Sequence, residues 1–129
     1  MILVDSSVWI ELIRHPSSDL AGAMGRVVEE EAATCGIVLQ EVLQGIRPVD
    51  YVDAVRQSLL RHHYLESPQV VFLKAADYTL RCRTEGLKLS TVDALIAAIC
   101  AHYEARLWTR DKDFFIAARF LPIRLYQPR

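Results

Sequence analysis

Short apolar segments alternate with amphipathic helices along this 129-residue chain, and this alternation constrains the fold more than any other feature. The predicted strands cover residues 2–4, 33–35, 64–66, 107–109 and 124–126. The predicted helices cover residues 8–13, 19–31, 37–45, 48–60, 69–85, 92–105 and 111–119. Strands that alternate with helices are typical of a parallel sheet with helices on its faces. We therefore expect an α/β protein whose short-stranded, mainly parallel sheet is flanked by helices.

The composition is that of one ordinary globular domain. Apolar residues make up 52% of the chain and charged residues 24%, which excludes a disordered or low-complexity segment. No apolar run approaches the ~20 residues that span a bilayer, and we expect no signal peptide. Three cysteines without a C-x-x-C pair argue against a disulfide framework or a structural zinc site. We expect a single domain over residues 1–129 that is cytoplasmic and makes no membrane contact.

Two aspartates follow directly on predicted strands. Asp5 ends the first strand, and Asp111 lies two residues after the strand at 107–109. Ligands of parallel α/β sheets bind outside the carboxyl ends of the strands, so both carboxylates should lie at that edge. The alternative for each is a helix-capping or first-turn role, which is a common use of aspartate.

Two further acids lie on predicted helices beside apolar faces. Glu41 falls at the rim of the apolar arc of the helix at 37–45, and Asp93 lies on the apolar stripe of the helix at 92–105. A buried, unpaired carboxylate is costly, so each acid needs a partner. The alternatives are a half-exposed acid at Glu41 and a capping box that begins at Ser90, with Asp93 at the third helical position.

Carboxylates that converge at one sheet edge repel one another and stay ionised only around a cation. Hard oxygen ligands select Mg²⁺ or Mn²⁺ over zinc. Such a site polarises a phosphoryl oxygen and generates hydroxide from a bound water. The four acids therefore indicate metal-dependent hydrolysis of phosphodiesters.

Four segments, in this order and at these distances, resemble PIN-domain ribonucleases, and specifically the VapC-type toxins of bacterial and archaeal toxin–antitoxin pairs. The segments are Ile2–Ile10, Leu39–Gly45, Ser90–Ala98 and Thr109–Phe114. The resemblance extends from Asp5 to Phe114, which is nearly the whole chain. It implies a PIN-like fold with three α/β/α layers. Ser6 stands where the family more often has threonine, and the hydroxyl group is kept.

The resemblance also implies the site residues. It assigns catalysis and metal binding to Asp5, Glu41, Asp93 and Asp111. Asp113 would be a fifth acid nearer the edge, and Ser6 and Thr109 match hydroxyl positions that support the carboxylates. The implied cofactor is Mg²⁺ or Mn²⁺.

The same resemblance implies an activity and partners. The activity is that of a metal-dependent endoribonuclease, which cuts tRNA, rRNA or mRNA and thereby inhibits translation. The partners are the RNA substrate, a cognate antitoxin that neutralises the toxin, and a second copy of the chain in a homodimer.

Charge is unevenly distributed although the net charge is only −1. Residues 1–80 carry six Lys and Arg against eleven Asp and Glu, whereas residues 81–129 carry nine against five. An RNA backbone needs cations, and the candidates are Arg110, Lys112, Arg81 and Arg83, with Lys88 and Arg119 further along the same half. The alternative is that these cations occupy ordinary solvated helix faces.

Other functions stay open on the residues alone. A haloacid-dehalogenase-like metal-dependent phosphatase needs a second Asp two residues after the nucleophilic one, and Ser7 occupies that position. A response-regulator receiver would place an acidic neighbour beside Asp5, and none is there. A non-catalytic PIN-like module that binds RNA or protein would usually lack acids of the quartet, and all four are present.

Overall fold

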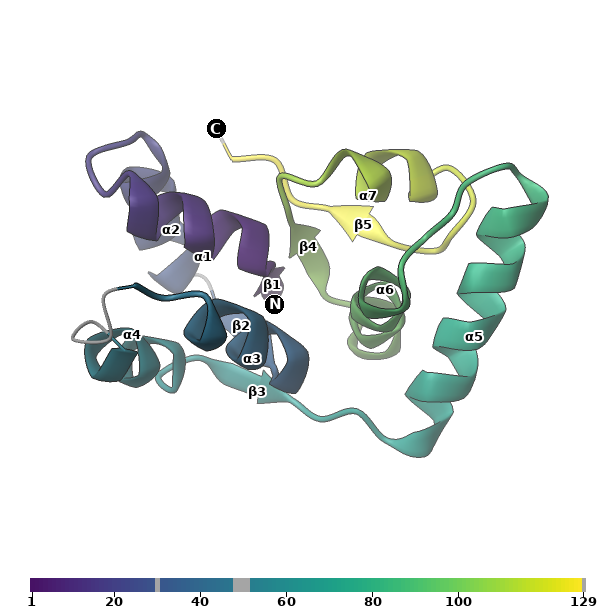
Figure 1. Cartoon of the computed structure of the whole chain (residues 1–129), viewed down its shortest axis with the longest axis horizontal. Helices are drawn as coiled ribbons and strands as arrows, with labels where there is room; N and C mark the ends of the chain where they lie inside the picture. Colours follow the sequence, from purple (N-terminus) through teal and green to yellow (C-terminus); the bar gives the residue numbers. More distant parts are fainter. Residues whose placement is uncertain (30, 48–51, 129) are drawn as a thin grey trace.

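The computed structural model describes residues 1–29, 31–47 and 52–128, and its centre is a sheet of parallel strands (Figure 1). The strands are β1 (Ile2–Val4), β2 (Ala32–Cys35), β3 (His63–Leu65), β4 (Arg106–Trp108) and β5 (Arg124–Leu125). Their order in the five-stranded sheet is β3-β2-β1-β4-β5, and all four neighbouring pairs are parallel. The predicted α/β class with a parallel sheet is confirmed.

Helices cover both faces of this sheet. They are α1 (Ser6–Arg14), α2 (Leu20–Glu29), α3 (Gly36–Gln44), α4 (Val52–Leu59), α5 (Gln69–Thr84), α6 (Thr91–Tyr103) and α7 (Lys112–Ala117). The chain steps from β1 outward to β3 through α1–α4 and then crosses back to β4 through α5 and α6. Right-handed crossovers in opposite directions place the two groups of helices on opposite faces. Figure 1 shows this three-layer arrangement, with α1–α4 on one side and α5 and α6 on the other.

The central strands are buried on both sides. Every residue of β1 and β2 is buried, as covered parallel strands require: β1 is a continuous apolar run, and β2 is apolar except for the buried Thr34. Helix α6 is buried over Ile96–Cys100 because it packs against both β4 and α5. The three cysteines are buried and unpaired.

The predicted boundaries agree with the described ones to within two residues. Helix α1 begins at Ser6, two residues earlier than predicted, because Asp5 occupies its N-cap position. Helix α5 ends before Gly86, whose φ of 81° suits a residue without a side chain. The predicted start of the helix at 48–60 lies outside the described residues.

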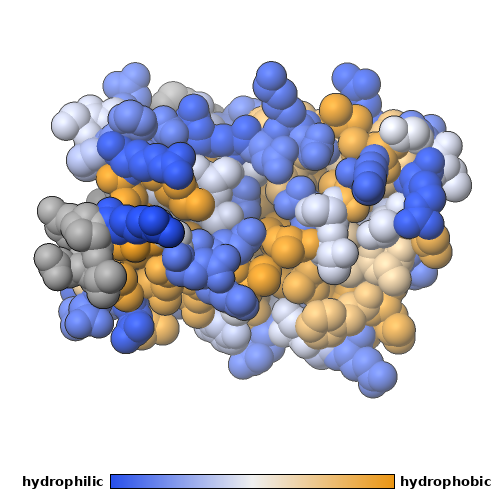
Figure 2. All heavy atoms as spheres, viewed as in Figure 1, coloured by the Kyte–Doolittle hydropathy of each residue, from blue (hydrophilic) through white to orange (hydrophobic). Residues whose placement is uncertain are grey.

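The surface of α5 carries exposed apolar side chains. Phe72, Leu73 and Leu80 are each more than half exposed and lie on one side of the helix; we refer to these three residues as the α5 apolar face. Figure 2 shows hydrophobic residues gathered over the part of the surface where α5 lies in Figure 1. Exposed apolar patches on a small domain often mark a contact with another protein.

None of the helices in the described part of the chain is long and apolar enough to cross a membrane.

Candidate metal centre

Asp5 is fixed at the carboxyl edge of the sheet by bonds to its backbone and its side chain. It follows β1, and its N–H donates to the carbonyl of Trp108 at 2.9 Å. Its carboxylate Oδ2 accepts from the hydroxyls of Thr109 at 2.8 Å and Ser7 at 2.7 Å. Only 4% of Asp5 is exposed. Two hydroxyl donors therefore replace the water that this buried carboxylate has lost, and they orient it.

These two hydroxyls are held in turn by the loop that follows β4. Ser7 Oγ accepts from the N–H of Arg110 at 3.0 Å and lies 3.4 Å from Thr109 Oγ1. Thr109 Oγ1 accepts from the N–H of Asp111 at 3.0 Å. The structure thus places Thr109, a predicted supporting residue, against Asp5. Ser7 makes the same contact and was not among the predicted site residues, since a serine at a helix start has an equally good local explanation.

Three aspartates from two helix N-termini meet beside Asp5. Asp93 lies in the first turn of α6, where its N–H donates to the N-cap Ser90 at 3.1 Å. Asp111 is the N-cap of α7 and accepts the N–H of Asp113 at 2.9 Å. One carboxylate oxygen from each of Asp93, Asp111 and Asp113 lies within 4.8 Å of the other two. We call these residues the three-aspartate cluster. Asp111 therefore caps α7 and also belongs to this cluster.

Negative charge accumulates at Asp93. Burial is the largest cause, and with the charge of Asp111 it raises the pKa of Asp93 from 3.8 to about 6. Asp5 and Asp113 raise this pKa further, whereas the hydrogen bond from Ser90 lowers it. A cation beside these carboxylates would favour their ionised forms.

Glu41 lies to one side of the cluster. Its Oε1 accepts from the hydroxyl of Ser6 at 3.0 Å. Because Ser6 follows Asp5 directly, this contact ties α3 to the same edge of the sheet. Within the described residues, the group of three acids whose oxygens all lie within 4.8 Å of one another includes neither Asp5 nor Glu41. The structure therefore brings the three-aspartate cluster together and places Asp5 and Glu41 at its flank.

The donor set fits a hard divalent cation. The three-aspartate cluster offers carboxylate oxygens only, at a separation that one ion can bridge. None of the described ion pairs includes an acid of the cluster. Oxygen ligands suit Mg²⁺ and Mn²⁺, whereas zinc sites usually contain nitrogen or sulfur. The residues present are thus suited to a magnesium-type ion.

Two of the predicted RNA-binding cations flank the cluster in sequence. Arg110 and Lys112 lie on either side of Asp111, and both are exposed. Arg110 also lines a hollow of about 810 Å³ that is bordered by residues of α1 and α2. These two cations lie next to the candidate metal centre along the chain.

The other two predicted cations lie on the last turns of α5 and have different surroundings. Arg83 lines a hollow of about 460 Å³ together with Lys88 and Ser90, beside the N-terminus of α6. Arg81 pairs with Glu85 at 3.3 Å. No ion pair described in the structure includes Arg83. The charge of Arg83 is therefore available to a ligand, and that of Arg81 is already compensated.

Comparison with known proteins gives one consistent answer. The PIN domain family model matches residues 2–120. The VapC ribonuclease Mb1587 of Mycobacterium bovis is 31% identical over 124 residues, which cover 92% of each chain. The crystal structure of VapBC2 from Rickettsia felis, bound to a DNA fragment from their promoter, has a TM-score of 0.80 at 17% identity over 98% of both chains. A toxin–antitoxin complex from Klebsiella pneumoniae has a TM-score of 0.65 at 24% identity, covering 88% of this chain and 90% of that one.

The two structural matches show a shared fold, and the family model and the Mycobacterium relative extend the agreement to the sequence itself. All four segments that carry the resemblance fall inside the matched residues 2–120. The chain belongs to the PIN domain family.

Proposed function

We propose that this chain is a divalent-metal-dependent endoribonuclease that acts in the cytoplasm as the toxin of a toxin–antitoxin pair. The observation that carries the proposal is the three-aspartate cluster at the carboxyl edge of the sheet. The 31% identity to a VapC ribonuclease over almost the whole chain supports it. The proposed cofactor is Mg²⁺ or Mn²⁺, and the proposed substrate is RNA.

In this proposal the acids hold the ion and the hydroxyls hold the acids. Thr109 and Ser7 both donate to Oδ2 of Asp5, and within the described structure no hydrogen bond reaches Oδ1. Oδ1 would therefore be the oxygen of Asp5 that is available to an ion bound by the three-aspartate cluster. The bound ion would supply a polarised phosphoryl oxygen and a water of lowered pKa.

Glu41 completes the acidic quartet from the flank. Its Oε1 accepts from the Ser6 hydroxyl at 3.0 Å, so Oε2 would be the oxygen available to a bound ion or to a proton. Ser6 thus acts through Glu41, as a positioning residue.

Arg83, Arg110 and Lys112 are the proposed contacts to the RNA backbone, since all are exposed and close in the fold or sequence to the cluster. Arg83 and Lys88 would hold a phosphate in the hollow beside the N-terminus of α6. Arg81 is expected to contribute little because Glu85 already neutralises it.

The proposed protein partners are an antitoxin and a second copy of the chain. The antitoxin is supported by the fold shared with the Klebsiella pneumoniae toxin–antitoxin complex. The second copy is supported by the α5 apolar face: Leu73 and Leu80 are exposed, and the small exposed residue Ala76 between them in sequence leaves room for a second α5 helix.

The experiment that tests the activity is cleavage of a mixed structured RNA by the purified chain in EDTA, Mg²⁺ and Mn²⁺. We expect metal-dependent cleavage that Asp93→Asn abolishes and that Asp77→Asn, a change to an exposed acid on α5, leaves intact. The Asp93→Asn variant should fold, because the change relieves repulsion. Equal cleavage by Asp93→Asn and the unmodified chain would refute the assignment of the site. Mass analysis of an inactive sample would detect a bound antitoxin as a second chain.

A further inference from the structure

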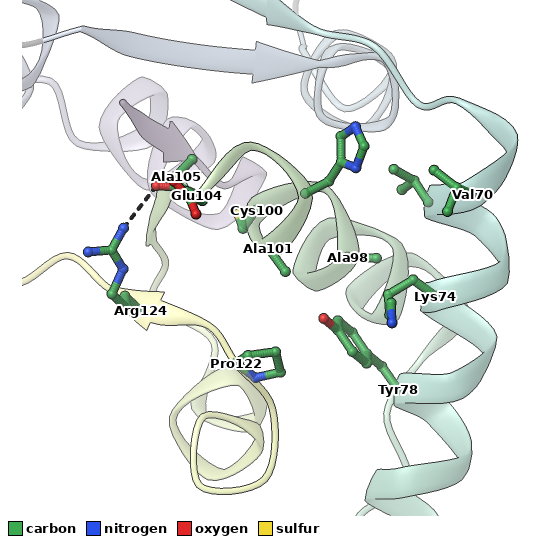
Figure 3. Close-up of a pocket in the computed structure, with 12 residues that line it drawn as sticks. Val70, Lys74, Tyr78, Ala98, Cys100, Ala101, Glu104, Ala105, Pro122 and Arg124 are labelled. Atoms are coloured by element: carbon green, nitrogen blue, oxygen red, sulfur yellow. Dashed lines mark hydrogen bonds between the residues drawn. The ribbon is translucent and has the colours of Figure 1, made fainter.

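A further hollow lies at the opposite edge of the sheet from the acids. A cavity of about 700 Å³ lies between α5, the second half of α6 and the segment that leads into β5 (Figure 3). Glu104 and Ala105 line it and directly precede β4, whereas the acids follow the carboxyl ends of the strands. The cavity is therefore separate from the candidate metal centre. Its size falls in the range of about 300–1,000 Å³ that is typical of small-molecule sites.

Small side chains on α6 create this space. Ala98 and Ala101 line the cavity from α6, and Ala105 continues the lining after the helix ends. Val71 of α5 adds an apolar wall opposite them. The methyl side chains of these alanines leave a gap between α5 and α6 that larger side chains would have filled. The gap is apolar along this side and suits the apolar part of a ligand.

Tyr78 brings a hydroxyl group without a partner into the cavity. The residue is only 7% exposed, and Figure 3 shows its hydroxyl pointing into the cavity. No hydrogen bond within the described part of the chain reaches this group. Burial, and then the charge of Asp77, raise the pKa of Tyr78, so the hydroxyl keeps its proton. The hydroxyl oxygen remains accessible to solvent although most of the side chain is buried, so it is free to donate to an acceptor in the cavity.

Lys74 brings a positive charge to the same place. It lies one helical turn before Tyr78, and Figure 3 shows its ammonium group directed into the cavity on the same side as that hydroxyl. None of the described ion pairs includes Lys74. Arg124 adds a second cation and is held in place by donating to the carbonyl of Glu104 at 2.9 Å. Glu104 is the one acidic residue of the lining, so cations and donors predominate.

We propose that this cavity binds a small organic anion. Its apolar body would lie against Ala98 and Ala101, and its acidic group would accept from the Lys74 ammonium and the Tyr78 hydroxyl. Such charge-assisted hydrogen bonds are stronger than neutral ones, particularly in a partly buried site. A carboxylate and a phosphate monoester both have this chemistry. The site shares no residue with the candidate metal centre and does not depend on the proposed ribonuclease activity.

The test is a titration of the isotope-labelled chain, in EDTA, with three probes that share one ring system. The probes are 1-naphthoate, 1-naphthyl phosphate and the neutral 1-naphthalenemethanol. We expect at least one anion to shift the backbone amide resonances of Lys74 and of residues 98–105, with the neutral alcohol about tenfold weaker or more. The ratio of the two anion affinities distinguishes a carboxylate ligand from a phosphate ligand.

Variants locate the binding within the cavity. Lys74→Met and Tyr78→Phe should each weaken binding of the anion about fivefold or more, whereas Arg61→Met, a change to an exposed cation outside the cavity, should leave it unchanged. Ala101→Leu should fill the space and abolish binding. Thermal unfolding of each variant shows whether it has folded, and RNA cleavage by folded variants should match that of the unmodified chain.

Three results would overturn the proposal. The first is that neither anion shifts these resonances at about 5 mM, a concentration that would reveal a dissociation constant in the millimolar range. The second is that the neutral alcohol binds as tightly as the anions. The third is that Lys74→Met leaves the affinity unchanged, or that the shifts appear at the carboxyl edge of the sheet instead.

Discussion

At the scale of single residues, the candidate site depends on short polar side chains that come from distant parts of the chain. The acids were predictable because carboxylates that end strands or interrupt apolar stripes form a recognisable chemical pattern. The position of Thr109 against Asp5, across 104 residues, depends on the pairing of β1 with β4. Ser7 contacts Asp5 only two residues away, but a serine at a helix start has an equally good explanation as a cap, and its second partner, the N–H of Arg110, is 103 residues away.

Thr109→Val tests whether the hydroxyl positions Asp5, because it removes the donor and keeps the shape of the side chain. We expect cleavage at limiting Mg²⁺ to fall about tenfold or more, as is common when a residue that orients a metal ligand is lost. The measurement is kcat/KM over a Mg²⁺ titration. The matched control is Thr79→Val, which removes a hydroxyl bond to the Ala75 carbonyl within α5 and should keep the rate. If both variants cleave equally well, Thr109 has no positioning role.

Asp93 makes stability depend on pH when no metal is bound. Its pKa of about 6 exceeds the unfolded value of 3.8, so between these values the folded chain binds more protons than the unfolded chain. The contribution of Asp93 to the free energy of unfolding therefore falls as pH rises through this window. Above about pH 6, Asp93 is ionised in both states and the destabilisation no longer increases. We expect Asp93→Asn in EDTA to raise Tm by roughly 3–5 °C near pH 7.5, about 1 kcal/mol, and by less near pH 5. Thermal scans at both pH values measure this, and Asp77→Asn should show no such difference.

At the scale of elements, the N-termini of α6 and α7 position the aspartates of the three-aspartate cluster. The N-cap residues Ser90 and Asp111 start α6 and α7 at the carboxyl edge of the sheet, which places Asp93 and Asp113 in first turns. The start of α6 was predictable because the capping signal at Ser90 is local. The start of α1 was not, since Asp5 and the serines after it are all good N-cap residues and only the pairing of β1 decides between them.

Ser90→Ala removes the cap of α6. We expect a loss of about 1 kcal/mol and a fall in Tm of roughly 3–5 °C, because the Asp93 N–H loses its acceptor at 3.1 Å. The control is Thr91→Ala, since within the described part of the chain no hydrogen bond is made by the Thr91 hydroxyl. Thermal unfolding measures both variants. A Tm for Ser90→Ala equal to that of the control would mean that the cap contributes nothing to stability.

The α5 apolar face is the proposed contact between two copies. Leu73→Glu places a charge in the middle of this face, and we expect it to convert a dimer into a monomer. Leu60→Glu is a matched control, because Leu60 is 63% exposed and Leu73 62%. Light scattering after size-exclusion chromatography gives the mass of each variant. A dimer that survives Leu73→Glu would place the interface elsewhere.

At the scale of the whole molecule, the sequence determines the sheet more readily than the spaces around it. The apolar segments and their alternation with helices are strong signals, and β1 and β2, buried on both sides, follow from them. The distances between acids depend on how α6 and α7 pack, so the separation of Glu41 from the three-aspartate cluster was not predictable. The cavity behind α6 was equally hidden, because periodicity identifies Ala98 and Ala101 as apolar positions without showing that they leave a gap.

Charge is also a property of the whole molecule, since a net charge of −1 conceals a basic second half. RNA held by that half should bind less tightly as salt increases, with a slope of about 0.7 in log–log form for each phosphate contacted on a single strand. We expect Arg83→Ala, made in the Asp93→Asn background so that RNA stays intact, to lower affinity and to reduce this slope by roughly one contact. Arg81→Ala should change neither, because Arg81 is already paired with Glu85 at 3.3 Å. Fluorescence anisotropy with a labelled RNA at several salt concentrations gives both quantities. Equal effects of the two substitutions would show that RNA does not bind in the hollow beside α6. An affinity that does not change with salt concentration would show that the basic half makes no contact with the RNA backbone.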